Sequence, residues 1–196
     1  MALTLKRNNQ KFKLFEKSNE FKEIGAGIGI ASNALEIFDK LNIGIEIMKR
    51  GHLLKRTILA TEKLKVLKTI PFPKEVYCIH RSLIIDTISN ELDKNSYELN
   101  KEVDSIENKK RIKVKFKDET IEEFKTLIAS DGINSTIRKS VFPEIGIRNA
   151  HQVIWRGITK FDINANLKHT YYELFEGTLR FLFLPLNDTE IFWLAV

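Results

Sequence analysis

The sequence predicts an α/β fold that is followed by the start of an antiparallel sheet. Residues 2–8 have the composition of a helix and residues 11–15 that of a strand, the order found after the first turn of a βαβ unit. Residues 81–92 repeat apolar side chains at the spacing of an amphipathic helix. From Gln152 onward, aromatic-rich strands alternate with turns, as in an antiparallel sheet. The expected fold class is therefore a partial Rossmann-like domain, without its first strand and glycine fingerprint, plus part of an antiparallel sheet.

The segments between these landmarks predict short helices and a strand pair. In chain order, we expect a polar connector over 18–24, a glycine-rich turn over 25–30, a helix over 33–41 with Ser32 as its N-cap, and a short helix over 43–49 that ends at Gly51. Residues 53–68 alternate apolar and polar side chains, which predicts a strand insertion around residues 53–72. Pro71 and Pro73 are expected to end it, because proline cannot donate a ladder hydrogen bond.

Three strands and a helix are expected before the aromatic-rich segment. The strands are predicted over residues 96–107, 111–116 and 120–129, and the helix begins at about Ser135. We therefore expect one α/β domain over residues 1–150, with the strand insertion inside it, and a second domain that begins over residues 151–196.

The composition is that of a globular protein with a packed core. The 196 residues are 43% hydrophobic and include 13 Phe but only 4 Pro, and no apolar run approaches the roughly 20 residues that span a bilayer. The net charge is +6, but lysines are mixed with glutamates along the chain, and the basic run over 108–117 alternates like a strand with a solvated face. We expect no nucleic-acid partner. One cysteine, Cys78, and no secretory signal indicate a cytoplasmic protein with a core thiol.

A glycine-rich motif, Gly25-Ala-Gly-Ile-Gly-Ile, resembles a dinucleotide-binding fingerprint but fits it poorly. Ile30 stands where the third glycine belongs, and residues 19–24 are too polar for a buried parallel strand. One alternative keeps the fingerprint, and residues 25–29 and Lys49-Arg50 would then bind the 2′-phosphate of NADP in a reductase. That alternative predicts a central strand over residues 20–24.

The strand over residues 11–15 fits better as the second strand of a Rossmann unit. Glu16 then lies at its end, where a carboxylate accepts hydrogen bonds from the hydroxyls of an adenosine ribose. A surface glutamate at a strand end would look the same.

Several blocks in fixed order resemble the flavin-dependent aromatic hydroxylases, the single-component FAD monooxygenases similar to salicylate and hydroxybenzoate hydroxylases. The blocks are Phe15-Glu-Lys-Ser, Glu23-Ile-Gly-Ala-Gly-Ile-Gly-Ile, Ser32-Asn-Ala-Leu, Ile79-His-Arg-Ser-Leu, Leu127-Ile-Ala-Ser-Asp-Gly-Ile-Asn-Ser-Thr-Ile-Arg and Trp155-Arg-Gly. The resemblance runs from residue 2 to residue 196. The order of the blocks is far more specific than any one of them.

The resemblance implies cofactor roles for individual residues. Glu16 and Lys17 would flank the adenosine ribose of FAD, and the backbone of Gly25, Ala26 and Gly27 would approach the flavin, where a side chain would be in the way. The remaining implied contacts are Arg81 at the diphosphate and ribitol, Val103 at the adenine, and Asp131 and Gly132 at the turn that serves FAD and the nicotinamide donor. Ser135 and Arg138 would support that turn.

The resemblance also implies a pocket for a small organic substrate. Trp155, Phe181 and Phe183 are candidates for its wall, although each could equally belong to the core of the sheet. His80 and His169 are expected to be structural, and we find no catalytic triad and no metal-ligand spacing.

The implied activity is monooxygenation, with NADPH or NADH as the electron donor and O2 as the oxidant. Two parts of the family pattern are missing, namely the glycine fingerprint before Ala2 and everything beyond Val196. We therefore expect a fragment that binds FAD weakly or not at all unless a complementary fragment supplies the first strand. The alternative to an enzyme is a non-catalytic remnant or binding module.

Overall fold

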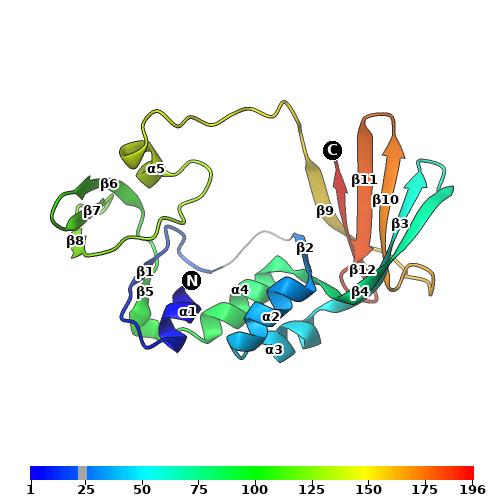
Figure 1. Cartoon of the computed structure of the whole chain (residues 1–196), viewed down its shortest axis with the longest axis horizontal. Coiled ribbons are helices and arrows are strands. Elements are labelled where there is room, and N and C mark those ends of the chain that lie inside the picture. The colour runs from blue at the N-terminus through cyan, green and yellow to red at the C-terminus, as the bar shows by residue number, and fades with distance from the viewer. Residues whose placement is uncertain (22–25) are drawn as a thin grey trace.

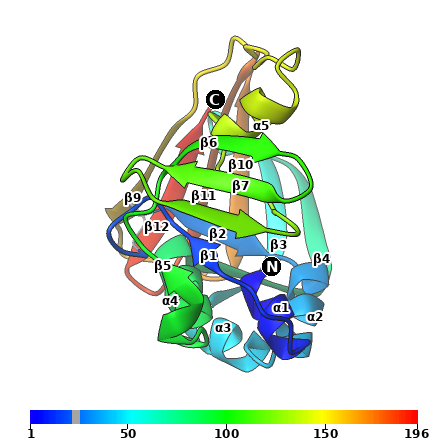
Figure 2. The same ribbon diagram turned by 90° about the vertical axis from the view of Figure 1, so that its left-hand side faces the viewer.

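The computed structural model describes residues 1–21 and 26–196, and these form three regions (Figure 1). A group of helices lies beneath, a small sheet with a short helix lies on one side, and a large curved sheet lies on the other. In Figure 2 the small sheet faces the viewer. Gly25 lies outside the described residues, and so do residues 22–24 of the strand predicted over residues 20–24.

The large sheet has seven strands in the order β2-β4-β3-β10-β11-β12-β9. They are β2 (Gly27–Ile30), β3 (His52–Thr61), β4 (Val66–His80), β9 (Trp155–Lys160), β10 (Thr170–Glu176), β11 (Leu179–Pro185) and β12 (Glu190–Ala195). β10 runs parallel to β3, and every other neighbouring pair is antiparallel. The strand insertion expected around residues 53–72 thus shares one sheet with the strands after residue 151. A division into units near residue 150 stays a prediction.

The expectation that Pro71 and Pro73 end a strand is wrong, because β4 continues through both. Pro71 pairs with Arg56 of β3, whereas β2 pairs with β4 only from Tyr77 to His80. The prolines therefore lie where β4 is the edge of the sheet, and a missing N–H is tolerated there.

Three helices pack together under the start of the sheet. They are α2 (Ser32–Lys40), α3 (Gly44–Arg50) and α4 (Arg81–Asn90). Their apolar faces meet in a buried core that contains Leu35, Ile47 and Ile84. All three helices were expected from the sequence, but Ser32 is the first helical residue and Ala31 is the N-cap.

The N-terminal helix and strand are also present as expected. α1 (Ala2–Arg7) is followed by β1 (Leu14–Phe15), which pairs in parallel with β5 (Tyr97–Glu98). A single 3-10 turn, η1 (Lys94–Ser96), leads into β5. The predicted strand over 11–15 is thus short, and one other strand pairs with it among the residues described.

The small sheet consists of β6 (Val103–Asn108), β7 (Ile112–Phe116) and β8 (Ile121–Phe124). The basic run forms a solvated strand face as expected, since Val114 and Phe116 are buried while Lys113 and Lys115 each form an ion pair with a glutamate. β8 ends at Phe124, so the strand predicted as far as residue 129 is shorter than expected. α5 (Thr136–Val141) follows, and residues 142–154 connect it to β9 without a helix or strand.

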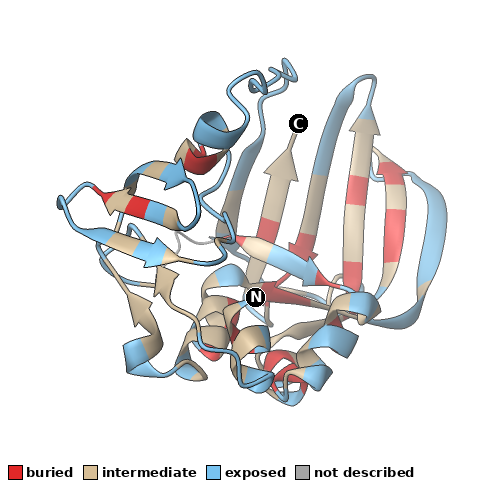
Figure 3. Ribbon diagram, turned by 60° about the vertical axis from the view of Figure 1, so that its left-hand side comes forward, coloured by how far each residue is buried: buried red, intermediate tan, exposed pale blue. Residues whose placement is uncertain are grey.

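The large sheet has two chemically different faces, because side chains alternate along each strand. We call the face that carries Leu184, Glu190 and Phe192 the inner face, and the opposite one the aromatic face. The aromatic face carries Trp155, Tyr172, Phe181, Phe183 and Trp193, four of which form a chain of ring contacts with centroids 5.0–6.1 Å apart. The base of the inner face is buried in a core, coloured red in Figure 3.

The sheet curves strongly, so that its first and sixth strands meet across the inner face. Ala26, just before β2, is buried in the same core as Leu184 and Phe192. β2 and β12 are separated in the sheet by four other strands. The inner face therefore encloses the segment that contains Ala26 and Gly27.

Candidate functional site

The first group of predicted cofactor residues comes together at the start of α4. The amide of Arg81 donates a 2.9 Å hydrogen bond to the carbonyl of Ala26, and Gly27 pairs with His80 in the sheet. Ala26 is buried and Arg81 is exposed. Residues about 55 positions apart in sequence are therefore neighbours, as the resemblance implies.

The glycine-rich segment is not the turn that was expected, because residues 27–30 form the strand β2. The space beside Gly27 is filled by a neighbouring side chain, since a Cβ there would lie 2.6 Å from Cγ of Phe192. Gly29 has open space, with no atom within 4 Å of such a Cβ. Close packing against Phe192 thus accounts for Gly27 without a ligand.

The second group, Glu16, Lys17 and Val103, lies at the carboxyl end of β1. The amide of Lys101 donates to the carbonyl of Glu16 at 2.9 Å, which brings the start of β6 beside this strand end. One oxygen of the Glu16 carboxylate accepts the amide of Ser18 at 2.9 Å. In open α/β sheets, ligands bind outside the carboxyl ends of parallel strands. The position of Glu16 fits that rule.

The third group, Asp131 and Gly132, forms the turn before α5. The helix begins at about Ser135, as expected, and Ser135 is its N-cap, with an Oγ that accepts the amide of Arg138 at 2.8 Å. The Asp131 carboxylate accepts the Ser135 hydroxyl at 2.5 Å and the amide of Ile137 at 3.1 Å. Gly132 has φ of +81°, which favours glycine. Asp131 therefore holds the turn, and Gly132 lets the backbone bend.

These contacts also set the ionisation of Asp131. Burial raises its pKa, but the hydrogen bonds from Ser135, Ile137 and Thr136 outweigh it, so that the pKa lies below the ordinary value. Asp131 is a carboxylate near neutral pH, with both oxygens engaged within its own turn.

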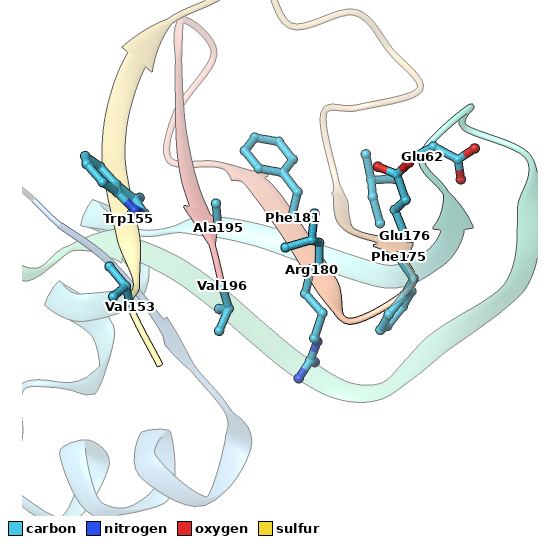
Figure 4. A pocket seen from close by; sticks show the side chains of 11 residues that line it. Glu62, Val153, Trp155, Phe175, Glu176, Arg180, Phe181, Ala195 and Val196 are labelled. Atoms are coloured by element: carbon cyan, nitrogen blue, oxygen red, sulfur yellow. The ribbon is translucent and has the colours of Figure 1, made fainter. Parts of the chain in front are cut away.

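The three aromatic residues predicted for a substrate pocket share the aromatic face, which faces away from Ala26 and Gly27. Trp155 and Phe181 are 69% and 39% exposed, so neither is core. Both line a cavity of about 510 Å³ at the end of the sheet where β12 stops, shown in Figure 4. Phe183 stacks on Tyr172 instead and does not line this cavity.

The inner face carries polar side chains that were not predicted from the sequence as site residues. Arg180 forms an ion pair with Glu173, whose side chain is 11% exposed, and lies 5.5 Å from the ring of Phe175. Burial, and then the charge of Glu173, raise the pKa of the Tyr171 phenol. Arg180 is the one charged residue in the otherwise apolar strand β11, and that isolated charge was a usable signal.

The reductase alternative is contradicted by the helix that contains Lys49 and Arg50. It needs these residues at the end of a strand, but they end α3, and Arg50 pairs with Glu46 and Asp86. Gly27 and Gly29 lie in an antiparallel strand, not in a phosphate-binding turn.

No protein-family model matches the chain. Two curated proteins align over its whole length, namely aurachin C monooxygenase/isomerase of Stigmatella aurantiaca at 22% identity and Monooxygenase 1 of Arabidopsis thaliana at 26%. The chain spans about half the length of these relatives, 53% and 50% respectively.

Solved structures agree with this fold. HpxO of Klebsiella pneumoniae, in complex with FAD and uric acid, matches 99% of the chain with a TM-score of 0.84 and 19% identity. PqsL of Pseudomonas aeruginosa, in complex with 2-aminobenzoylacetate, matches 99% with a TM-score of 0.83 and 12% identity. The chain covers 52% and 56% of these two proteins.

Both curated relatives are named as monooxygenases, and the solved structures of similar fold include a complex with FAD and a probable FAD-dependent monooxygenase. The resemblance expected from the sequence is thereby confirmed, as is the α/β fold class with a partial domain. The monooxygenase homologues cover every predicted site residue, but their likeness does not test the role of any of them. No helix among the described residues is long and apolar enough to cross a membrane. Over residues 1–21 and 26–196, no cluster of His, Cys, Asp or Glu is arranged to hold a metal ion.

Proposed function

We propose that this chain forms part of an FAD-dependent monooxygenase that acts on a small organic substrate. The observation that carries the proposal is the meeting of Ala26, Gly27 and Arg81 with the inner face of the large sheet, in a chain whose homologues are monooxygenases along its whole length. This arrangement gives one surface for a cofactor and one for a substrate, with a common core between them.

The residues present fit parts of an FAD site. Glu16 has a second carboxylate oxygen for a ribose hydroxyl, and Arg81 offers a permanently charged fork for phosphate oxygens. Gly132 allows close backbone approach, since a Cβ there would have no atom within 4 Å. Asp131 would act through the turn that it holds, because Ser135 and Ile137 occupy its oxygens.

When bound, the flavin would accept electrons from NADPH or NADH and activate O2, and the protein would supply position, electrostatics and exclusion of water. We assign the substrate side to the inner face, where Tyr171, Glu173 and Arg180 lie. Trp155, Phe181 and Phe183 belong to the opposite face, and we keep them as a second candidate because two of them line the cavity.

We also propose that a complementary segment completes the cofactor site. The chain spans about half of its curated relatives, and β1 pairs with β5 alone among the described strands. A further parallel strand beside β1 would complete a nucleotide-binding sheet. The same coverage supports the alternative, a non-catalytic binding module. A cytoplasmic location, inferred from the single buried Cys78, belongs to the proposal.

Titration of FAD fluorescence tests the cofactor site. The purified chain is expected to quench FAD weakly but saturably, and E16Q and R81A are expected to weaken that binding several-fold. R7A is the matched control, because Arg7 is also a helical arginine but lies in α1, where it forms an ion pair with Glu91. Equal affinity in all four proteins contradicts the proposal, and so does the absence of FAD binding both in the chain alone and in its complex with a complementary segment.

Oxygen uptake separates the enzyme from the binding module. The chain is co-expressed with a segment that supplies a strand and a Gly-x-Gly-x-x-Gly turn. Stoichiometric yellow cofactor with NADPH- or NADH-dependent O2 uptake supports the monooxygenase. A folded complex that holds FAD but consumes no O2 supports the binding module.

A further inference from the structure

His80 lies where three elements of the candidate site meet. It is the last residue of β4 and the N-cap of α4, directly before Arg81. It pairs with Gly27 of β2 in the sheet. Any contact made by the imidazole of His80 therefore bears on the position of both β2 and the start of α4.

The imidazole connects this junction to the far side of the sheet. Its Nε2 lies 3.1 Å from Oε2 of Glu190, the first residue of β12. Asn187, in the turn before β12, donates its side-chain amide to the same oxygen at 2.6 Å. Hydrogen bonds from Asn187 and then His80 lower the pKa of Glu190, so the carboxylate is ionised near neutral pH.

This polar contact lies beside an apolar one between the same elements. Glu190 and Phe192 are two residues apart in β12, and so both point toward the inner face. Phe192 fills the space next to Gly27, while Glu190 reaches the residue that pairs with Gly27. The apolar contact gives attraction without direction, whereas a hydrogen bond to an ionised partner fixes geometry.

We infer that His80 is a positioning residue. Through Glu190 and Asn187 it fixes β2 and the Arg81 end of α4 against β12, across the inner face of the large sheet. The inference rests on the proposed function for its link to FAD. The structural part of the inference, the stability of the hydrogen bond from the Arg81 amide to the Ala26 carbonyl, can be measured without any cofactor.

Three variants of the 196-residue chain test the inference. H80A removes the contact, and H80Q places an amide nitrogen near the position of Nε2. D188A is the matched control, because Asp188 lies in the same turn as Asn187 but pairs with Lys168. Hydrogen exchange at the Arg81 amide and FAD affinity by fluorescence titration are measured for each variant.

We expect H80A to speed exchange at the Arg81 amide about tenfold and to weaken FAD binding by a similar factor, as loss of a hydrogen bond to a charged group would. H80Q should restore both to within a few-fold, and D188A should change neither. Unchanged exchange in H80A, or no rescue by H80Q, overturns the inference. So does unchanged FAD affinity in H80A when the parent chain binds FAD. A parent chain that binds no FAD either alone or with a complementary segment overturns the proposed function instead, and the exchange result alone then decides the positioning role.

Discussion

Two glycines of the same strand have different structural surroundings. Gly27 and Gly29 are both in β2, and the family resemblance implied that the backbone around Gly27 approaches a flavin. The structure separates them, because Phe192 occupies the side-chain space of Gly27 and nothing occupies that of Gly29. A glycine motif can therefore reflect packing at one position and open space at the next.

This difference predicts opposite outcomes for the same substitution. G27A forces a Cβ against Phe192 and should lower the free energy of unfolding by about 1–3 kcal/mol, the usual cost of overpacking. G29A meets no atom and should lie within about 1 kcal/mol of the parent, on the stabilising side if the backbone is compatible. Urea unfolding of both variants is the measurement. Equal destabilisation would show that the conformation of β2, not Phe192, requires the glycines.

Cys78 is a core thiol, as expected. Burial raises its pKa to about 12, so almost none of it is thiolate at neutral pH. A thiol reagent such as dithionitrobenzoate should therefore react with the folded chain orders of magnitude more slowly than with the chain in urea. Rapid reaction of the native protein at pH 8 would mean that the core around Cys78 opens readily.

The short helix α5 is stabilised at its N-terminus by side chains of the preceding turn. In α5 the cap is made by Ser135, and Asp131 supports it from the preceding turn. S135A should cost about 1 kcal/mol of local stability, as loss of an N-cap does. Hydrogen exchange at the Arg138 amide, which bonds to Ser135, should accelerate by about fivefold or more while amides in β7 stay protected. An equal increase in both would indicate global unfolding instead.

The turn between β7 and β8 carries a strongly acidic carboxyl. Hydrogen bonds from Lys101 and Thr120 lower the pKa of Asp118 to about 2. Because the folded pKa is depressed, this carboxylate stabilises the turn above the unfolded pKa of about 4, and the contribution disappears as the pH falls toward 2. An NMR titration of the Asp118 carboxyl carbon should give a midpoint near 2, and K101M should move it upward. A midpoint near 4 in the parent chain would contradict the hydrogen bonds.

The helices could be predicted from sequence because their signals are local. The apolar spacing of α4 and the Ser135 cap of α5 lie within a few residues of the structure that they specify. Strand pairing could not be predicted, because the partner of a strand can be anywhere in the chain. Pro71 shows this directly, since whether it ends a strand depended on which edge of β4 had a neighbour.

The candidate site was predicted as a set of residues, but not as an arrangement. The order of the family-like sequence blocks indicated Ala26 and Arg81, and in the structure the amide of Arg81 bonds to the carbonyl of Ala26. The side of the sheet on which Trp155 and Phe181 lie could not be predicted, because aromatic content indicates a strand without saying which way its side chains point. The isolated charge of Arg180 in an apolar strand was a usable signal, but its partner Glu173 lies in another strand, and that pairing could not be predicted from the sequence.

At the scale of the molecule, one sheet joins the two halves of the chain. β3 and β4 come from the first half and β9–β12 from the second, and β3 pairs with β10. The connector over residues 142–154 is the covalent link from the part of the chain that contains β3 and β4 to the part that contains β9–β12, and the sheet is a second, non-covalent link between them (Figure 1).

Cleavage of this connector should therefore leave the molecule whole. With a specific protease site inserted between Gly146 and Asn149, the cut chain is expected to elute as one species in gel filtration and to separate only in denaturant. The uncut insertion variant is the control. Separation of the two pieces under native conditions would show that the strands after residue 151 form an independent unit.

The pairing of β3 with β10 has a consequence during synthesis. Arg56 and Thr170 are register partners 114 residues apart, so at elongation rates of about 5–20 residues per second β3 is synthesised roughly 6–23 s before its partner exists. For that time the nascent chain carries an open apolar strand edge, the kind of surface that promotes aggregation and recruits chaperones. The yield of native protein should then depend on how fast the chain is translated as well as on how stable it is once folded.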